Sequence, residues 1–177
     1  MKISFLLLFA VLISGIVPAQ KQIQVRDQRF EMNAIREGKP VKLETKKFGL
    51  KINYETGEFF AKINIEESRL YDDDEVEYRI PGDEIIEISG IIPINEIIDN
   101  KEQNRQYVFE LNVIHLSTNI PVVFTFDVAY IQNSAAGFTM FRINGEIDLR
   151  YFGVVDLKGY DPIVGLFLGF QGYMIGN

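Results

Sequence analysis

The sequence predicts an all-β protein built as an antiparallel meander, which forms either an up-and-down barrel or a sandwich. Segments of alternating apolar and polar residues, rich in β-branched and aromatic side chains, recur about every 10 to 12 residues. Short polar turns separate these segments. No stretch long enough for an ordinary helix shows an apolar period of 3.6 residues.

The first 19 residues have the pattern of a secretory leader. Lys2 supplies a positive start, residues 3–13 are almost entirely apolar, and Val17, Pro18 and Ala19 form a short, mostly small-residue segment at the cleavage position. The apolar run is shorter than the roughly 20 residues that a membrane-spanning helix needs. We therefore expect residues 1–19 to be a cleaved signal peptide. A single mature domain over residues 20–177 would then be periplasmic or secreted, with no membrane anchor.

Before the middle of the chain, strands are expected at residues 21–27, 40–45, 48–54 and 58–65, with a hairpin turn at 55–57. Four adjacent acidic residues at 72–75 repel one another and predict a solvated loop. A calcium loop is less favoured, because the spaced ligands and turn glycine of an EF-hand are missing. A short strand at 76–80, a turn at 81–83, a strand at 84–94 and one helical turn at 95–99 follow.

The last third has the clearest alternation, with strands expected at residues 105–116, 120–130, 138–149 and 163–175. Gly165, Gly169 and Gly172 interrupt the final strand. A glycine within a strand indicates either a bend or the close approach of a ligand, and a barrel bend is favoured here. An eight-stranded barrel is near the size at which side chains just fill the interior or one small ligand fits. Strand counting therefore leaves a packed core and a ligand pocket both open.

The composition excludes several kinds of site. The chain has no Cys and one His, so disulfides, thiolate zinc sites and multi-His metal sites cannot form. The formal charge of -7 argues against nucleic acid as a partner. No nucleophile-elbow, zinc-protease or P-loop motif occurs. His115 is expected at a strand end, bound to a turn rather than acting as a base. We expect no enzyme, no metal and no cofactor.

From Arg105 to Ile175 the sequence resembles the YceI-like family of exported β-barrel proteins. The resemblance depends on the strand at residues 109–113, on the turn and second strand at 117–128, and on residues 145–153. These last residues match a G-x-I-D-x-x-x-F-G pattern. Residues 57–65 are more weakly similar to an early strand of the family. The central helix of the family has no counterpart here, and the acidic loop and the turn at 81–83 take its place.

The resemblance implies a lipocalin-like antiparallel barrel of about eight strands, whose apolar interior holds an isoprenoid or fatty chain in the family. The inward residues that would line such a pocket are Phe109, Phe124, Phe126, Phe141, Ile143 and Phe167. The expected function is therefore binding of an amphiphilic lipid or isoprenoid. One alternative is a non-enzymatic structural or interaction barrel with a solid core. Another is an outer-membrane barrel, because alternation does not show which face is apolar.

Overall fold

The structure, a computed structural model, describes residues 23–65, 68–71, 77–79, 85–100, 103–132, 137–154 and 157–174. The expected signal peptide, the acidic loop at 72–75 and the turn at 81–83 lie outside these residues. Eleven strands are described: β1 (Ile23–Arg36), β2 (Lys39–Thr45), β3 (Phe48–Ile52), β4 (Glu58–Asn64), β5 (Arg69–Tyr71), β6 (Glu77–Arg79), β7 (Ile85–Ile91), β8 (Arg105–His115), β9 (Thr118–Gln132), β10 (Gly137–Asp148) and β11 (Ile163–Met174). A helix, α2 (Ile94–Asp99), and a 3₁₀ turn, η2 (Leu149–Phe152), complete the described elements.

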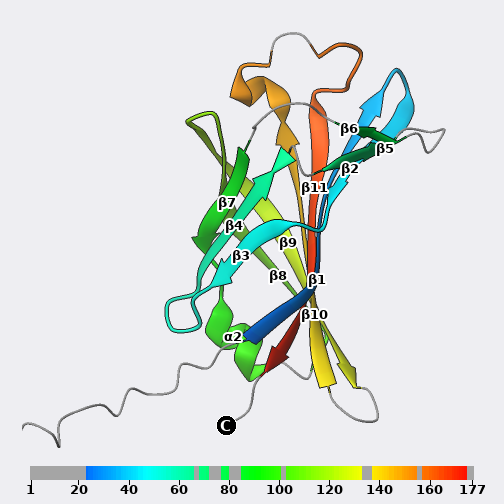
Figure 1. The fold of residues 1–177 in the computed structure, drawn as a ribbon. Helices are drawn as coiled ribbons and strands as arrows, with labels where there is room; N and C mark the ends of the chain where they lie inside the picture. Colours follow the sequence, from blue (N-terminus) through cyan, green and yellow to red (C-terminus); the bar gives the residue numbers. More distant parts are fainter. Residues whose placement is uncertain are drawn as a thin grey trace, which may run out of the picture.

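All of these strands belong to one antiparallel sheet, in the order β3-β4-β7-β8-β9-β10-β11-β1-β2-β5-β6. Strands β7 to β11 follow one another both along the chain and across the sheet, as an up-and-down meander requires (Figure 1). The expected all-β antiparallel barrel is confirmed. The sheet has more strands than the roughly eight that the resemblance implies. Each of the ten segments expected from the alternation corresponds to a strand, and β5, which pairs with β2 and β6, is the one that was not expected.

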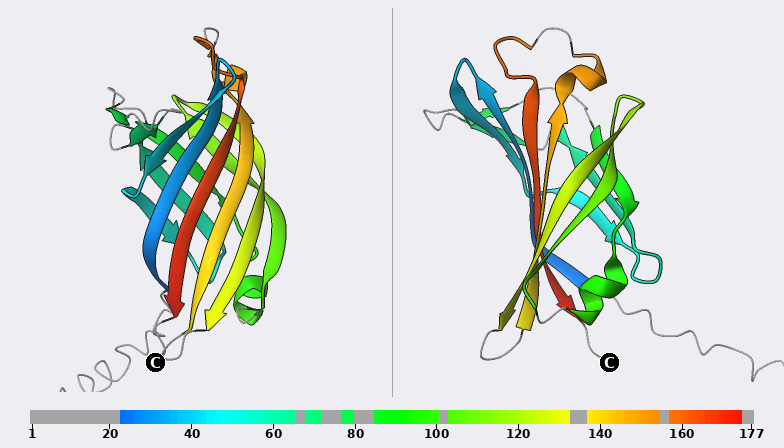
Figure 2. Two further views of the ribbon diagram at one scale, coloured as in Figure 1. Left: turned by 90° about the vertical axis from the view of Figure 1, so that its right-hand side faces the viewer. Right: turned by 180° about the vertical axis from the view of Figure 1, so that it is seen from behind.

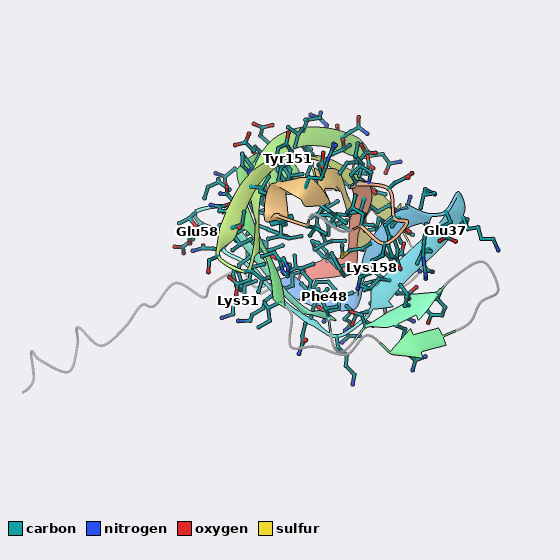
Figure 3. The ribbon with its side chains drawn as sticks, turned by 90° about the horizontal axis from the view of Figure 1, so that it is seen from above. Glu37, Phe48, Lys51, Glu58, Tyr151 and Lys158 are labelled. Carbon is teal, nitrogen blue, oxygen red and sulfur yellow. The ribbon has the colours of Figure 1, made fainter. Side chains whose placement is uncertain are left out.

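The barrel closes where β2 passes into β3, because the end strand β3 lies beside β1. Only two residues separate these strands, yet β2 pairs with β1 and β3 pairs with β4. The Gln28 side-chain amide of β1 donates a hydrogen bond to the backbone oxygen of Phe48, with a nitrogen–oxygen distance of 2.7 Å. The sheet therefore wraps around its interior, and the ring is visible along the barrel axis (Figure 3).

Strand β1 continues to Arg36, whereas its end was expected at residue 27. The expected strand was too short because a β-bulge interrupts the alternation of apolar and polar residues at that point. Between the pairs Arg26 with Gln171 and Arg29 with Gly169, β1 contains one residue more than β11. Asp27 takes a positive φ of 49° at this bulge. An extra residue reverses the faces of every later side chain. The inward side therefore changes from Val25 to the even-numbered residues that begin with Phe30.

Toward η2 the wall of the barrel divides into two branches. Beyond the bend between β2 and β3, β2 pairs with β1 and β5, whereas β4 pairs with β7. The branch of β1, β2, β5 and β6 diverges from the branch of β4 and β7 (Figure 1). The opposite end is covered by α2, the expected helical turn, whose Ile94 and Ile97 are buried. The barrel is thus narrow and covered at the α2 end and wide at the η2 end (Figure 2).

The apolar faces of the strands point into the barrel. On β9, for example, Val122, Phe124 and Phe126 are buried, whereas the intervening Val123 is exposed. The outer face carries charged pairs such as Lys62 with Glu87, which are 3.2 Å apart across β4 and β7. The apolar face of the sheet is therefore the inner face, and the charged pairs lie on the outer face.

Candidate functional site

A cavity of about 380 Å³ lies inside the barrel at the η2 end. It is lined by apolar side chains from both branches of the wall and from the segment between β10 and β11: Met32, Ala34, Val41, Leu43, Ile65, Leu70, Ile86, Val113, Ile147, Leu149, Phe152, Val154 and Val164. His115 and Tyr160 also border it and carry its polar side-chain atoms. Ligand sites in proteins are typically apolar hollows of at least about 300 Å³ with a few polar groups.

The divided wall is the physical reason for this cavity. In the narrow part of the barrel, β3 pairs with β4 and lies beside β1, where the Gln28 side chain reaches the backbone of Phe48. Near η2, Val41 and Leu43 of β2 face Ile65 and Ile86 across the interior without such a strand between them. Leu70 of β5 lines part of the interval. The separation of the strands, rather than the identity of one side chain, therefore leaves the space.

Residues 157–161 follow η2, border the cavity through Tyr160, and are hydrogen-bonded to the hairpin of β1 and β2. The backbone N–H of Glu37 donates to the oxygen of Gly159 at 2.9 Å, and that of Asp161 donates to the oxygen of Ile35 at 2.8 Å. The Arg36 guanidinium lies 5.5 Å from the centre of the Tyr160 ring, within the range of a cation–π contact. Figure 3 looks onto this end of the molecule, where Glu37, Tyr151 and Lys158 lie.

The residues that carried the family resemblance build η2 itself. The Asp148 carboxylate accepts the backbone N–H of Arg150 at 3.0 Å and caps the turn. It also accepts from the Arg150 guanidinium at 2.9 Å. This hydrogen bond is the main reason that the pKa of Asp148 is lowered and that of Arg150 is raised. Gly153 ends the turn with a φ of 78°, a left-handed conformation that suits glycine. The motif thus positions Leu149 and Phe152 over the cavity.

His115 lies at the end of β8, on the border of the cavity. Its Nδ1 is 3.3 Å from the backbone oxygen of Ile85, at the start of β7. Its ring meets the edge of Phe152, with 5.7 Å between the ring centres. From the sequence, His115 is expected at a strand end, bound to a turn. The structure confirms the strand end and gives the first residue of β7 as the backbone partner.

None of the six residues expected to line a pocket borders the cavity. Phe124, Phe126 and Ile143 are fully buried, Phe141 is buried, and Phe109 packs against the same core. The ring centres of Phe109 and Phe126 are 5.4 Å apart, those of Phe126 and Phe141 are 5.6 Å apart, and Phe141 stacks on Phe170 at 4.9 Å. These inward residues therefore form packed core toward the α2 end of the barrel.

Phe167 corrects one expected orientation, because it lies on the outer face. Its neighbours Leu166 and Leu168 are buried, whereas the Phe167 ring lies 5.8 Å from the Arg29 guanidinium. Gly169 shares this outer face, and a Cβ there would come within 2.9 Å of the Phe167 ring. The absence of a side chain at Gly169 therefore makes room for the Phe167 ring on the outer face, and not for a ligand in the barrel interior.

Within the described part of the chain, no three acidic or histidine side chains cluster as metal ligands. Nor does any helix described there have the length and apolar character needed to cross a membrane.

The fold and the cavity together define a single antiparallel barrel with an apolar hollow at one end. A polyisoprenoid-binding domain from Saccharophagus degradans, implicated in plant cell wall breakdown, has a similar fold. The TM-score is 0.57 at 6% sequence identity, and the match covers 88% of this chain and 98% of that chain. No family model and no curated protein matches the chain. At this identity the likeness shows the fold.

Proposed function

We propose that this protein binds an amphiphilic lipid or an isoprenoid, with the apolar part of the ligand in the cavity at the η2 end. The observation that carries the proposal is the cavity itself, about 380 Å³ of space bordered almost entirely by apolar side chains. Apolar surface gains free energy when it leaves water for such an environment. His115 and Tyr160 would lie beside the polar end of the ligand.

The structural neighbour supports this proposal, because that protein is a polyisoprenoid-binding domain. The sequence resemblance over residues 105–175 supports a relationship to the YceI-like family in the same way. The site chemistry favours binding over catalysis, since the cavity border offers one histidine and one tyrosine among apolar residues.

Ligand binding is tested by extraction and by a cavity-filling variant. Protein purified from the organism that makes it should yield a lipid or isoprenoid on organic extraction and mass spectrometry. In vitro, Ala34→Phe places a ring in the cavity and should weaken binding of a fluorescent fatty-acid probe at least tenfold. The control Val108→Phe adds the same ring on the outer wall, where Val108 is 66% exposed, and should leave binding unchanged. Equal affinities in the two variants would place any ligand outside the cavity.

The alternative is a structural or interaction barrel that holds no ligand. The packed aromatic core toward α2 favours it, because that part of the interior is filled by the protein's own side chains. The two functions differ in one measurable respect. A structural barrel should release no lipid on extraction and should bind no fatty-acid probe at any concentration that leaves the protein folded.

We further propose that the protein is exported after cleavage behind Ala19, on the strength of the leader pattern in residues 1–19. Intact mass measurement of protein recovered from the native organism tests this. A mature chain that begins at Gln20 is expected, and a chain that retains residues 1–19 in the cell interior would contradict export.

A further inference from the structure

One layer below the residues that line the cavity, a floor of fully buried side chains crosses the barrel. Five strands lead from a residue that lines the cavity toward the α2 end. On each of them, the next inward side chain, two positions along, is at most 2% exposed. This relation links Met32 to Phe30 on β1 and Val113 to Leu111 on β8. The same relation gives Ile63, Ile88 and Leu166 on β4, β7 and β11, and Phe124 of β9 lies in the same layer. The floor therefore consists of Phe30, Ile63, Ile88, Leu111, Phe124 and Leu166.

Phe124 completes this floor because β10 has a glycine opposite it. Phe124 of β9 pairs with Gly145 of β10, two residues from the cavity residue Ile147. A Cβ on Gly145 would lie 2.6 Å from two ring carbons of Phe124, a distance that real side chains do not tolerate. The Phe124 ring therefore occupies the inward position that a β10 side chain would otherwise take. One ring thus covers the interior next to two strands.

The volume above this floor limits the ligand. An engineered apolar cavity of about 150 Å³ is known to hold benzene, with its six carbons. The present cavity is about two and a half times as large, which corresponds to roughly 15 carbons. Building on the proposed function, we infer that the bound apolar chain has roughly 15 carbons, and that Phe124, seated on Gly145, sets this limit. A longer chain would have to pass through the floor or leave its remaining carbons in water outside the wide end.

The inference is tested with the full mature chain by displacement of a fluorescent fatty-acid probe. One series contains straight-chain fatty acids of about 10 to 20 carbons, and the other contains isoprenoid alcohols of about 10, 15 and 20 carbons. Below the limit, each added methylene should tighten binding about fourfold. Affinity should then level off or fall beyond about 15 to 16 carbons. The series that shows the sharper optimum identifies the chain type.

The variants separate the floor from the rest of the core. Phe124→Ala, or the milder Phe124→Leu if the first does not fold, should move the optimum to longer chains by at least two carbons. Phe126→Ala removes the same ring from the same face of β9, one layer deeper, and should leave the optimum in place. The floor does not determine the chain length if affinity keeps rising to the longest chains, or if Phe124→Leu leaves the optimum unchanged. Either result would leave the proposed lipid binding intact. If no chain binds at any length, the proposed function fails as well.

Discussion

Replacement of Phe126 by alanine should destabilise the protein strongly without affecting its cavity. Phe126 is fully buried and lies between Phe109 and Phe141, with ring-centre distances of 5.4 and 5.6 Å. Removal of a buried phenylalanine typically costs about 3–5 kcal/mol of unfolding free energy. Each aromatic pair is worth about 0.5–1.5 kcal/mol beyond the area it buries, so we expect the upper part of that range. A domain is stable by about 5–15 kcal/mol, which should leave the variant folded.

The measurement is urea unfolding followed by far-ultraviolet circular dichroism, since the chain has no tryptophan for fluorescence. The midpoint should fall at an unchanged slope. Phe152→Ala is the matched control, because Phe152 is only half-buried and borders the cavity. This control should lose less stability and more affinity for the fatty-acid probe. A loss below about 1.5 kcal/mol for Phe126→Ala, or a loss of probe binding at full stability, would refute a packed core toward α2.

Three further predictions concern the turns and the titratable groups. Leu116, at the tip of the β8–β9 hairpin, is 74% exposed and has a φ of 46°, a left-handed conformation that asparagine adopts more easily than leucine. Leu116→Asn should therefore raise the unfolding free energy by about 1 kcal/mol. An unchanged urea midpoint would contradict this. Burial raises the pKa of Tyr54 to about 12, so its stabilising contribution is complete below the ordinary pKa of about 10 and is lost as the pH rises to 12. Tyr54→Phe should therefore unfold less readily than the native chain over that interval, and an absorbance titration should lose its latest-ionising tyrosine. The Arg150 guanidinium lowers the pKa of Asp148, so that contribution is complete above about pH 3.9 and is lost below it. Arg150→Gln should raise the Asp148 pKa in a carboxylate NMR titration, and an unchanged value would show that the hydrogen bond does not form.

The strands and their inward faces were predictable from the sequence because one side of each strand must leave water. On β9 the period of two runs without interruption through Val122, Phe124 and Phe126, and burial follows it. The second half of β1 was missed because the bulge at Asp27 reverses the period in the middle of a strand. No composition signal identifies a single inserted residue, although Phe30, Met32 and Ala34 do alternate after it.

The orientation of Phe167 was wrong because apolar residues occupy both faces of β11. Residues 164, 166, 168 and 170 are all bulky and apolar, whereas Gly165, Gly169 and Gln171 share a face with Phe167. A face with two glycines and a glutamine cannot fill a core, so this comparison would have placed Phe167 outside. The signal was present in the sequence but was obscured by the three successive apolar residues 166–168.

The cavity could not be predicted, because it depends on the divergence of strands rather than on any periodic pattern. Val41 and Val122 are both buried to 6% exposure, yet only Val41 borders the cavity. The one sequence feature at the division of the wall is the pair Lys46 and Lys47, which interrupts the alternation between β2 and β3. Such a break shows where a strand changes partners but does not show how far the two branches separate.

The size of the hollow bears on the choice between a ligand-binding barrel and a structural one. Side chains that line an unfilled hollow lose the packing contacts that a filled core would give them, so about 380 Å³ of apolar space lowers the stability of the barrel. The same chain packs Phe124, Phe126 and Ile143 without exposure a few residues away, so its sequence is able to fill a barrel. A barrel maintained only for stability would gain by larger residues at Ala34 or Val164. An apolar hollow above a closely packed layer is what the proposed binding of an apolar chain requires.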